Sequence, residues 1–368
     1  MNGSFKFHLP TEIVFGTDVI KEAGPKFALG KKALIVTGKT SAKASGALAD
    51  VLAVLPTDYV LFSEVENNPS EETVKKGGQL ARKEKCDYII AIGGGSPLDA
   101  AKVMGILAVN DAEPAELYEM GWENEALPVV AIPTTAGTGS EVTQYAVLTL
   151  EDEQTKKGLG GKDLFPRVAY LDPKYTASLP VSITVDTAVD ALSHLVEGYL
   201  SKRATPASDL TALQGMATWS TALEKLRRGE LDQEVRGALL LASCLAGVTI
   251  AQSGTTIVHA LGYPLTYFHG FPHGRANGVL MGAYLQFMAK FAPDKVDNVL
   301  DILGLASLDE FSDLMEEFFG GYKGHLSLSE EQIQAYAAKA AQTGNCANTL
   351  GGLSADDVAE ILKASIMV

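Results

Sequence analysis

Cysteine is scarce in this chain of 368 residues, and the three that occur, Cys86, Cys244 and Cys346, lie far apart. An odd number of widely spaced thiols fits neither a disulfide framework nor a cysteine-ligated metal site, so we expect reduced thiols in a cytoplasmic protein. The first ten residues lack the basic and apolar regions of a signal peptide, which favours the same location.

Basic residues are also few, because 30 lysines and arginines face 45 acidic residues and give a formal net charge of −15. This excess of negative charge argues against nucleic acid and against an anionic membrane surface as partners. No apolar run reaches the length of a membrane span, so we expect no membrane association. An anionic ligand would therefore need a local positive site.

The pattern of apolar runs changes near residue 180, and the length allows two domains. Before this point, short apolar runs alternate with helical patterns, the runs being residues 12–16, 33–37, 58–62, 87–92 and 128–132. This alternation predicts a parallel sheet with helices on both faces. After it helices dominate, with segments expected near residues 183–202, 206–227, 232–261 and 277–291. We expect an α/β domain over residues 1–180 and an all-α domain over residues 181–368.

Three glycines, residues 93–95, follow the apolar run that ends at Ile92. Glycine lets the backbone turn sharply and approach a ligand closely. Ser96 suits a helix N-cap, Pro97 the first helical position and Asp99 a capping box. The positive end of the helix would then face the glycine turn, which predicts an anion site suited to a pyrophosphate. The alternative is a plain strand-to-helix turn.

A second candidate cofactor loop, residues 133–141, combines two glycines with four hydroxyl side chains, those of Thr134, Thr135, Thr138 and Ser140. Such a loop can line a nucleotide without adding charge, and a flexible polar loop is the alternative.

The end of the first buried run supplies a third candidate segment, where Gly38 is followed by Thr40 and Ser41 with Lys39 and Lys43 beside them. In dinucleotide folds an acid near this place binds the ribose 2′-hydroxyl, whereas a basic residue admits a 2′-phosphate. We therefore predict that NADP(H) is preferred over NAD(H). In the alternative, both lysines are ordinary solvated charges.

Asp190 and His194 are four residues apart, so in a helix both side chains leave the same face and can bind one divalent cation. His259 and His273 follow downstream, the second in a segment that resembles the mouth of a loop. One carboxylate and three imidazoles suit iron or zinc better than calcium or magnesium. An Asp/His pair at helical spacing is also common without any metal.

Four motifs in this order closely resemble the iron-containing (group III) alcohol dehydrogenases, namely Gly93–Lys102, Pro133–Glu141, Asp190-x3-His194 and His259-x13-His273. The resemblance implies a dinucleotide-binding role for residues 1–180 and a metal-binding role for residues 181–368. It implies that Fe²⁺, or alternatively Zn²⁺, is held by the four residues of the last two motifs. It further implies cofactor contacts from Gly94, Gly95, Ser96, Asp99, Thr134, Thr135, Thr138 and Lys156. Many members have an aspartate where Gly38 stands, and the NADP-using propanediol and butanol dehydrogenase branch is the most similar.

The resemblance implies a metal-dependent alcohol dehydrogenase or aldehyde reductase that transfers a hydride between a primary alcohol or diol and NAD(P). There are two alternatives. One is a zinc-type polyol oxidoreductase similar to glycerol dehydrogenase, and the other is a lyase similar to dehydroquinate synthase. Some members have a histidine where this sequence has Tyr263, and a catalytic proton relay is assigned to that histidine. His269 is a candidate substitute for the relay. In the alternative, His269 is a loop histidine without a catalytic role. A homodimer is also implied, with residues 5–7 as a candidate contact.

Overall fold

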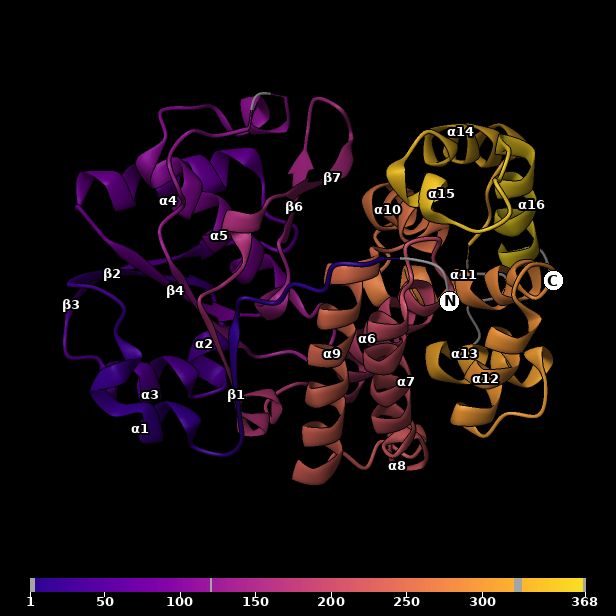
Figure 1. Cartoon of the computed structure of the whole chain (residues 1–368), viewed down its shortest axis with the longest axis horizontal. Helices are drawn as coiled ribbons and strands as arrows, with labels where there is room; N and C mark the ends of the chain where they lie inside the picture. The colour runs from indigo at the N-terminus through magenta and orange to yellow at the C-terminus, as the bar shows by residue number, and fades with distance from the viewer. Residues whose placement is uncertain (1–3, 120, 321–325, 367–368) are drawn as a thin grey trace. The chain divides into compact units, whose positions relative to one another are not determined.

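The computed structural model of the chain describes residues 4–119, 121–320 and 326–366, and it divides into two compact units (Figure 1). One unit is Leu9–Leu179, and the other combines Met1–His8 with Pro180–Val368. The first contains a parallel sheet flanked by helices and the second is helical, which confirms the predicted fold class.

The first unit is built on a six-stranded sheet in the order β1-β8-β5-β4-β2-β3, in which every strand pair is parallel. The strands are β1 (Glu12–Phe15), β2 (Lys32–Gly38), β3 (Asp58–Val65), β4 (Tyr88–Gly93), β5 (Val129–Pro133) and β8 (Val168–Leu171). The chain leaves β2 toward β3 on one side, whereas β4 and β5 lie on the other side. The order therefore reverses between β2 and β4, where open α/β sheets bind their ligands.

Both faces of this sheet are covered, as Figure 1 shows. Alternate residues of the central strands point to opposite faces, so that Ile89 and Ala91 join one core cluster and Ile90 and Ile92 the other. One cluster is completed by α4 and α5 and the other by α1 and α3. The helices are α1 (Val19–Ala23), α2 (Ser41–Ala44), α3 (Ala47–Val54), α4 (Glu71–Lys83) and α5 (Gly95–Val109), with short 3-10 turns at Gly24–Phe27, Pro114–Tyr118, Ser140–Val142, Lys162–Leu164 and Pro173–Thr176.

Three strands of this unit lie outside the predicted runs. β6 (Tyr145–Leu150) and β7 (Thr155–Gly160) form a separate antiparallel hairpin, and β8 joins the large sheet between β1 and β5. β7 has the sequence TKKGLG, whose lysines and glycines give no apolar run, so a pattern of hydrophobic residues could not identify it.

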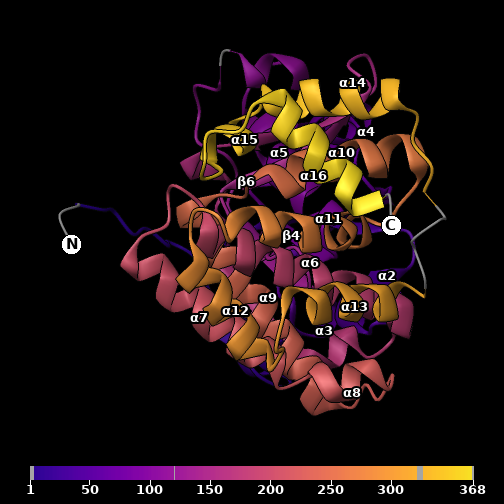
Figure 2. The same ribbon diagram turned by 90° about the vertical axis from the view of Figure 1, so that its right-hand side faces the viewer.

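The second unit contains only helices among the elements that the structure describes there. They are α6 (Val181–Leu200), α7 (Pro206–Ser220), α8 (Leu223–Arg227), α9 (Gln233–Ser253), α10 (Ile257–His269), α11 (His273–Met288), α12 (Pro293–Leu303), α13 (Leu308–Phe319), α14 (Glu330–Ala341), α15 (Gly344–Asn348) and α16 (Ala355–Ile366). The long helices α6, α7 and α9 run side by side (Figure 1), and α16 packs against α11 and α14 (Figure 2).

Two of the expected helical segments are in fact interrupted. Residues 206–227 contain a break between α7 and α8, and residues 232–261 divide into α9 and α10. The second break occurs at Gly254, which ends α9 with a φ of 69°, a conformation that favours glycine. α11 begins at His273, four residues before its predicted start, so His273 lies in a first helical turn.

Among the residues that the structure describes, one helix, α9, is long and apolar enough to cross a membrane by length and composition alone, and 72% of its most apolar stretch is buried inside the structure. Buried core helices of globular proteins have the same composition, so this helix is weak evidence for a membrane span.

Candidate functional site

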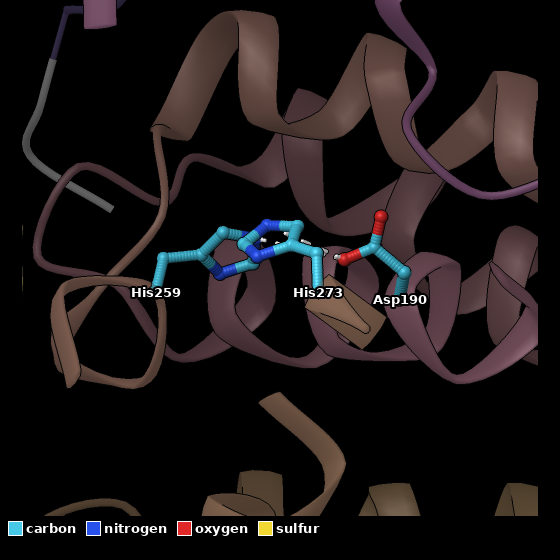
Figure 3. Close-up of side chains that lie close together, drawn as sticks. All are labelled: Asp190, His259 and His273. Carbon is cyan, nitrogen blue, oxygen red and sulfur yellow. Dashed lines mark ion pairs between the residues drawn. The ribbon is translucent and has the colours of Figure 1, made fainter. Parts of the chain in front are cut away.

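Three side chains with metal-ligating groups converge inside the helical unit: Asp190 from α6, His259 from α10 and His273 from the start of α11 (Figure 3). Their ligand atoms all lie within 4.8 Å of one another. Asp190 Oδ1 lies 4.0 Å from His259 Nε2 and 3.8 Å from His273 Nε2. Asp190 and His259 are buried, and the side chain of His273 is 25% exposed. One divalent cation can be shared by donors this close.

His194, one turn after Asp190 on α6, reaches the same place. Its Nε2 lies 2.8 Å from Nε2 of His259, and the two rings stack with centroids 4.5 Å apart. Two imidazole nitrogens at this distance need a proton or a cation between them, because their lone pairs repel. The structure thus brings together all four residues predicted as metal ligands.

Asn277 is a member of this cluster that the sequence analysis missed. It is fully buried one turn after His273 on α11, and its Nδ2 lies 3.1 Å from Asp190 Oδ1, 3.2 Å from His259 Nε2 and 3.5 Å from His273 Nε2. Its Oδ1 has no hydrogen-bond partner within the part of the chain that the structure describes. The four-residue spacing from His273 was the available signal.

Glu197 is a second residue that the sequence analysis missed. It is completely buried on α6, contacts His259 Nδ1 through Oε2, and accepts a hydrogen bond from the Thr256 backbone N–H at 2.9 Å through Oε1. Burial opposes ionisation, but the interaction with His259 and the hydrogen bonds from Thr256 outweigh it and lower the pKa of the Glu197 carboxyl. With Asp190 and His194, Glu197 makes a polar stripe at helical spacing, which was its signal in the sequence.

The crossing of α6 and α11 depends on a glycine. A Cβ added to Gly274 would overlap the carbonyl oxygen of Asp186 and approach the Cβ of Asp190 to 3.0 Å. Only glycine allows two helices to come this close. The close crossing brings His273, the residue before Gly274, to the carboxylate of Asp190.

His269, the candidate for a proton relay, ends α10 and lies outside the group of mutually close ligand atoms. Its Nε2 lies 3.0 Å from the Tyr336 hydroxyl, and burial lowers the pKa of its imidazole. Tyr263, which stands where some family members have a histidine, stacks on the ring of His273 with centroids 5.8 Å apart. The relay stays a prediction.

The three segments predicted to bind the cofactor follow neighbouring strands of the α/β unit. β2 pairs with β4 up to Thr37 and Ile92, and β4 pairs with β5 up to Gly93 and Pro133. Because parallel strands end at one edge of the sheet, the segments after them lie side by side at the carboxyl edge.

The glycine turn and the hydroxyl loop are in direct contact at this edge. A Cβ on Gly94 would lie 3.1 Å from Thr135, and one on Gly95 would lie 2.7 Å from Thr138. Thr134 is buried, and its Oγ1 has no hydrogen-bond partner among the described residues. The first turn of α5 and the threonine side chains therefore lie together in one small region.

The predicted start of α5 was two residues too late. The helix begins at Gly95 with Gly94 as its N-cap, so Ser96 and Pro97 lie within the first turn. The Oγ of Ser96 accepts a hydrogen bond from Asn68 N at 3.0 Å instead of capping the helix. The two glycines permit this earlier start because neither has a side chain to strike the facing threonines.

Asp99 binds the neighbouring loop and completes no capping box. Its Oδ1 accepts a hydrogen bond from Ser140 Oγ at 2.5 Å, and its Oδ2 accepts one from Val147 N at 2.9 Å. Lys102, which is buried, donates to Ser140 Oγ at 2.8 Å and to the Tyr145 carbonyl at 2.7 Å. Burial raises the pKa of Asp99 and lowers that of Lys102 to about 8. These contacts fasten α5 to the hydroxyl loop.

The remaining predicted cofactor residues lie around the same edge. Gly38 ends β2, Thr40 is the N-cap residue of α2, and Ser41 is the first residue of that helix. A Cβ on Gly38 would lie 3.4 Å from the Val65 carbonyl, so a side chain fits there. Lys156 lies on β7, and its charge offsets part of the effect by which burial raises the pKa of Asp99.

Two family models match the chain: "Iron-containing alcohol dehydrogenase" over residues 10–173 and "Fe-containing alcohol dehydrogenase family, C-terminal" over residues 184–366. The chain belongs to the iron-containing alcohol dehydrogenase family. This family membership confirms the resemblance that the four motifs indicated.

Three curated members of the iron-containing alcohol dehydrogenase family illustrate the similarity. The chain is 35% identical to a 1,3-propanediol dehydrogenase of Citrobacter freundii, over 82% of this chain and 79% of that protein. It is 30% identical to an NAD-dependent methanol dehydrogenase of Bacillus methanolicus, over 98% and 99%. It is 32% identical to an NADPH-dependent butanol dehydrogenase of Clostridium saccharobutylicum, over 82% and 78%.

A solved structure agrees with these matches. The crystal structure of an iron-containing alcohol dehydrogenase from Thermotoga maritima superposes with a TM-score of 0.92 at 39% identity, over 99% of this chain and all of that one. The protein is thus an oxidoreductase with alcohol dehydrogenase activity, and membership of this family favours that activity over the lyase alternative.

Proposed function

We propose that the protein is a divalent-metal-dependent, NADP(H)-preferring enzyme that interconverts primary alcohols or diols and their aldehydes. The observation that carries the proposal is the convergence of Asp190, His194, His259 and His273 in the helical unit. Fe²⁺ is the proposed ion, with Zn²⁺ as the alternative.

The donor set fits such an ion. One carboxylate oxygen and imidazole nitrogens suit iron and zinc, whereas calcium and magnesium prefer oxygen ligands alone. These acceptor groups lie close together in a mostly buried position, where a cation would balance the charge of Asp190. When bound, the ion supplies Lewis acidity to an alcohol or carbonyl oxygen.

The chain's own residues have separate tasks in this proposal. The N-terminus of α5 and the threonine loop bind the phosphates of the dinucleotide, and the Asp99–Lys102 contacts keep these two segments together. The nicotinamide, when bound, accepts or supplies the hydride. In the helical unit, the close crossing at Gly274 and the hydrogen bonds of Asn277 hold the donor atoms in place.

An assay of the metal-stripped chain tests this function. Under anaerobic conditions with a short aldehyde, we expect NADPH consumption only after Fe²⁺ or Zn²⁺ is added. His273→Ala should abolish the metal-dependent rate, whereas His8→Ala, at an exposed histidine outside the cluster, should retain it. Equal rates with and without metal would overturn the proposed site.

The cofactor preference has its own test at Gly38. NAD- and NADPH-dependent relatives both occur, so the family alone does not decide it. Gly38→Asp places a carboxylate where it would repel a 2′-phosphate and bind a ribose hydroxyl. We expect kcat/KM for NADPH to fall and that for NADH to rise, with little change in Gly38→Ala. A wild type that favours NADH would contradict the preference.

The homodimer and the cytoplasmic location stay predictions. Phe5 and Phe7, in the predicted contact segment, are 51% and 41% exposed, which leaves apolar surface available to a second copy. Light scattering of the wild type and of a Phe5→Ser/Phe7→Ser variant would test the contact. We expect the wild type to have the mass of a dimer and the variant to have the mass of a monomer.

A further inference from the structure

Both carboxylate oxygens of Glu197 bind residues at the start of α10, the helix that contains the proposed metal ligand His259. Oε2 contacts Nδ1 of His259, and Oε1 accepts hydrogen bonds from Thr256 N at 2.9 Å and Thr256 Oγ1 at 2.7 Å. The Glu197 side chain is 0% exposed, and Thr256 precedes the first residue of α10. A fully buried carboxylate is therefore used to orient the start of α10 and the ring of His259.

The Nδ1 contact determines which nitrogen of His259 carries the proton. An ionised carboxylate only accepts hydrogen bonds, so the proton must be on Nδ1, and Nε2 keeps its lone pair. The contact at Nε2 supports the same tautomer. The Asn277 amide nitrogen, which can only donate a hydrogen bond, lies 3.2 Å from Nε2, so Nε2 must accept. The same amide nitrogen lies 3.1 Å from Asp190 Oδ1, an acceptor, which fixes the orientation of the amide.

We propose that Glu197 is a positioning residue that holds His259 in the Nδ1–H tautomer and directs the lone pair of Nε2 at the metal site. This inference rests on the metal site proposed above. A carboxylate that accepts the second N–H of a ligating histidine fixes the ring and increases the basicity of the ligand. Glu197 would therefore act on metal affinity without touching the metal or the substrate.

The variant Glu197→Gln isolates this role because the two side chains have nearly the same shape. The backbone N–H of Thr256 requires the amide oxygen, so the amide NH₂ is left facing Nδ1 of His259. A donor facing Nδ1 favours the tautomer with the proton on Nε2, the nitrogen that would ligate the metal. We expect metal affinity to fall by about 10- to 100-fold.

Two measurements on the full chain test the inference. Nitrogen-15 histidine spectra of the metal-free protein should show His259, assigned with a His259→Gln variant, in the Nδ1–H form in the wild type and the Nε2–H form in Glu197→Gln. Competition with a chromophoric chelator should show weaker Zn²⁺ and Fe²⁺ binding in Glu197→Gln. An unchanged tautomer, or an unchanged affinity, would overturn the role of Glu197.

Tyr284→Phe serves as the matched control. The Tyr284 hydroxyl lies 3.1 Å from Thr256 Oγ1 in the same buried network, yet Tyr284 makes no hydrogen bond to His259 within the described residues. We expect this variant to keep the wild-type tautomer and metal affinity. An equal loss of affinity in Tyr284→Phe would show a general packing effect and contradict the inference. A wild type that binds neither ion would overturn the metal site itself.

Discussion

The carboxyl of Glu141 illustrates how burial changes the chemistry of a single residue. Its side chain is 1% exposed, Oε1 has no hydrogen-bond partner among the residues described, and burial raises its pKa from 4.5 to about 7. Below about pH 4.5 the carboxyl is neutral in both the folded and the unfolded chain. Between about pH 4.5 and 7 the unfolded chain ionises first, so stability falls as pH rises through this window.

Glu141→Gln should remove this loss, because the amide has the same shape and no charge. We expect the variant to be more stable than the wild type by on the order of 3 kcal/mol above about pH 7, at about 1.4 kcal/mol per pKa unit. The difference should vanish near about pH 4. Urea unfolding midpoints across this range would measure it, with the exposed Glu64→Gln as a control. A constant difference at all pH values would contradict the prediction.

At the same scale, sequence reasoning identified the four side chains that the structure brings together, but not the residues that contact them. Asp190, His194, His259 and His273 are rare residue types at informative spacings, so the sequence alone was enough to find them. Glu197 and Asn277 share this helical spacing, but a buried glutamate or asparagine in a helix resembles an exposed one in the sequence. Only the contacts with His259 distinguish them.

At the scale of helices, the crossing of α6 and α11 makes a specific prediction. Gly274→Ala adds a methyl group that overlaps the Asp186 carbonyl oxygen, so α11 must move away from α6. Overpacking of this kind typically costs about 1–3 kcal/mol. Because His273 begins α11, its Nε2 should also move away from Asp190. We expect a lower urea midpoint together with weaker metal binding.

Gly344→Ala is the matched control for this substitution. Gly344 begins α15, and a Cβ there would meet nothing within 4 Å. Alanine in such a position stabilises by about 0.4–1 kcal/mol, because it restricts the unfolded chain. If Gly274→Ala also proved neutral or stabilising, the close crossing would not be what positions His273.

Helices and strands were predictable where an apolar pattern was strong, and their ends were not. The runs that became β2, β4 and β5 are buried along their whole length or nearly so, which explains their clear signal. The division of residues 232–261 depends on the backbone conformation of Gly254, a single glycine within an otherwise helical pattern. The start of α5 likewise depends on contacts with a loop about forty residues later.

At the scale of the whole molecule, the alternation of strands and helices followed by helices alone was enough to predict the fold class. The strand order could not be predicted from the sequence. β1 and β8 pair in the sheet although they lie at opposite ends of the α/β unit in the sequence. Such pairings depend on which surfaces fit together, and periodicity contains no information about them.

The division of the chain into two units predicts that the metal ion and the dinucleotide stabilise different parts of the chain. All four proposed metal ligands belong to the helical unit, on α6, α10 and α11, and all proposed dinucleotide contacts belong to the α/β unit. A ligand that binds only the folded state stabilises by about 2.7 kcal/mol at a hundred times its dissociation constant. Metal should therefore protect the helical unit first, and NADPH the α/β unit.

Hydrogen exchange followed by mass spectrometry can separate these effects within one molecule. Adding Zn²⁺ to the metal-free chain should slow amide exchange in α6, α10 and α11, because the ion would link these three helices in the folded state. Adding NADPH should slow exchange in residues 93–99 and 134–140 instead. His259→Ala should lose the first effect and keep the second, since His259 lies in the helical unit. Protection of residues 93–99 by Zn²⁺ alone would place the ion at the cofactor loops and contradict the assignment of its ligands.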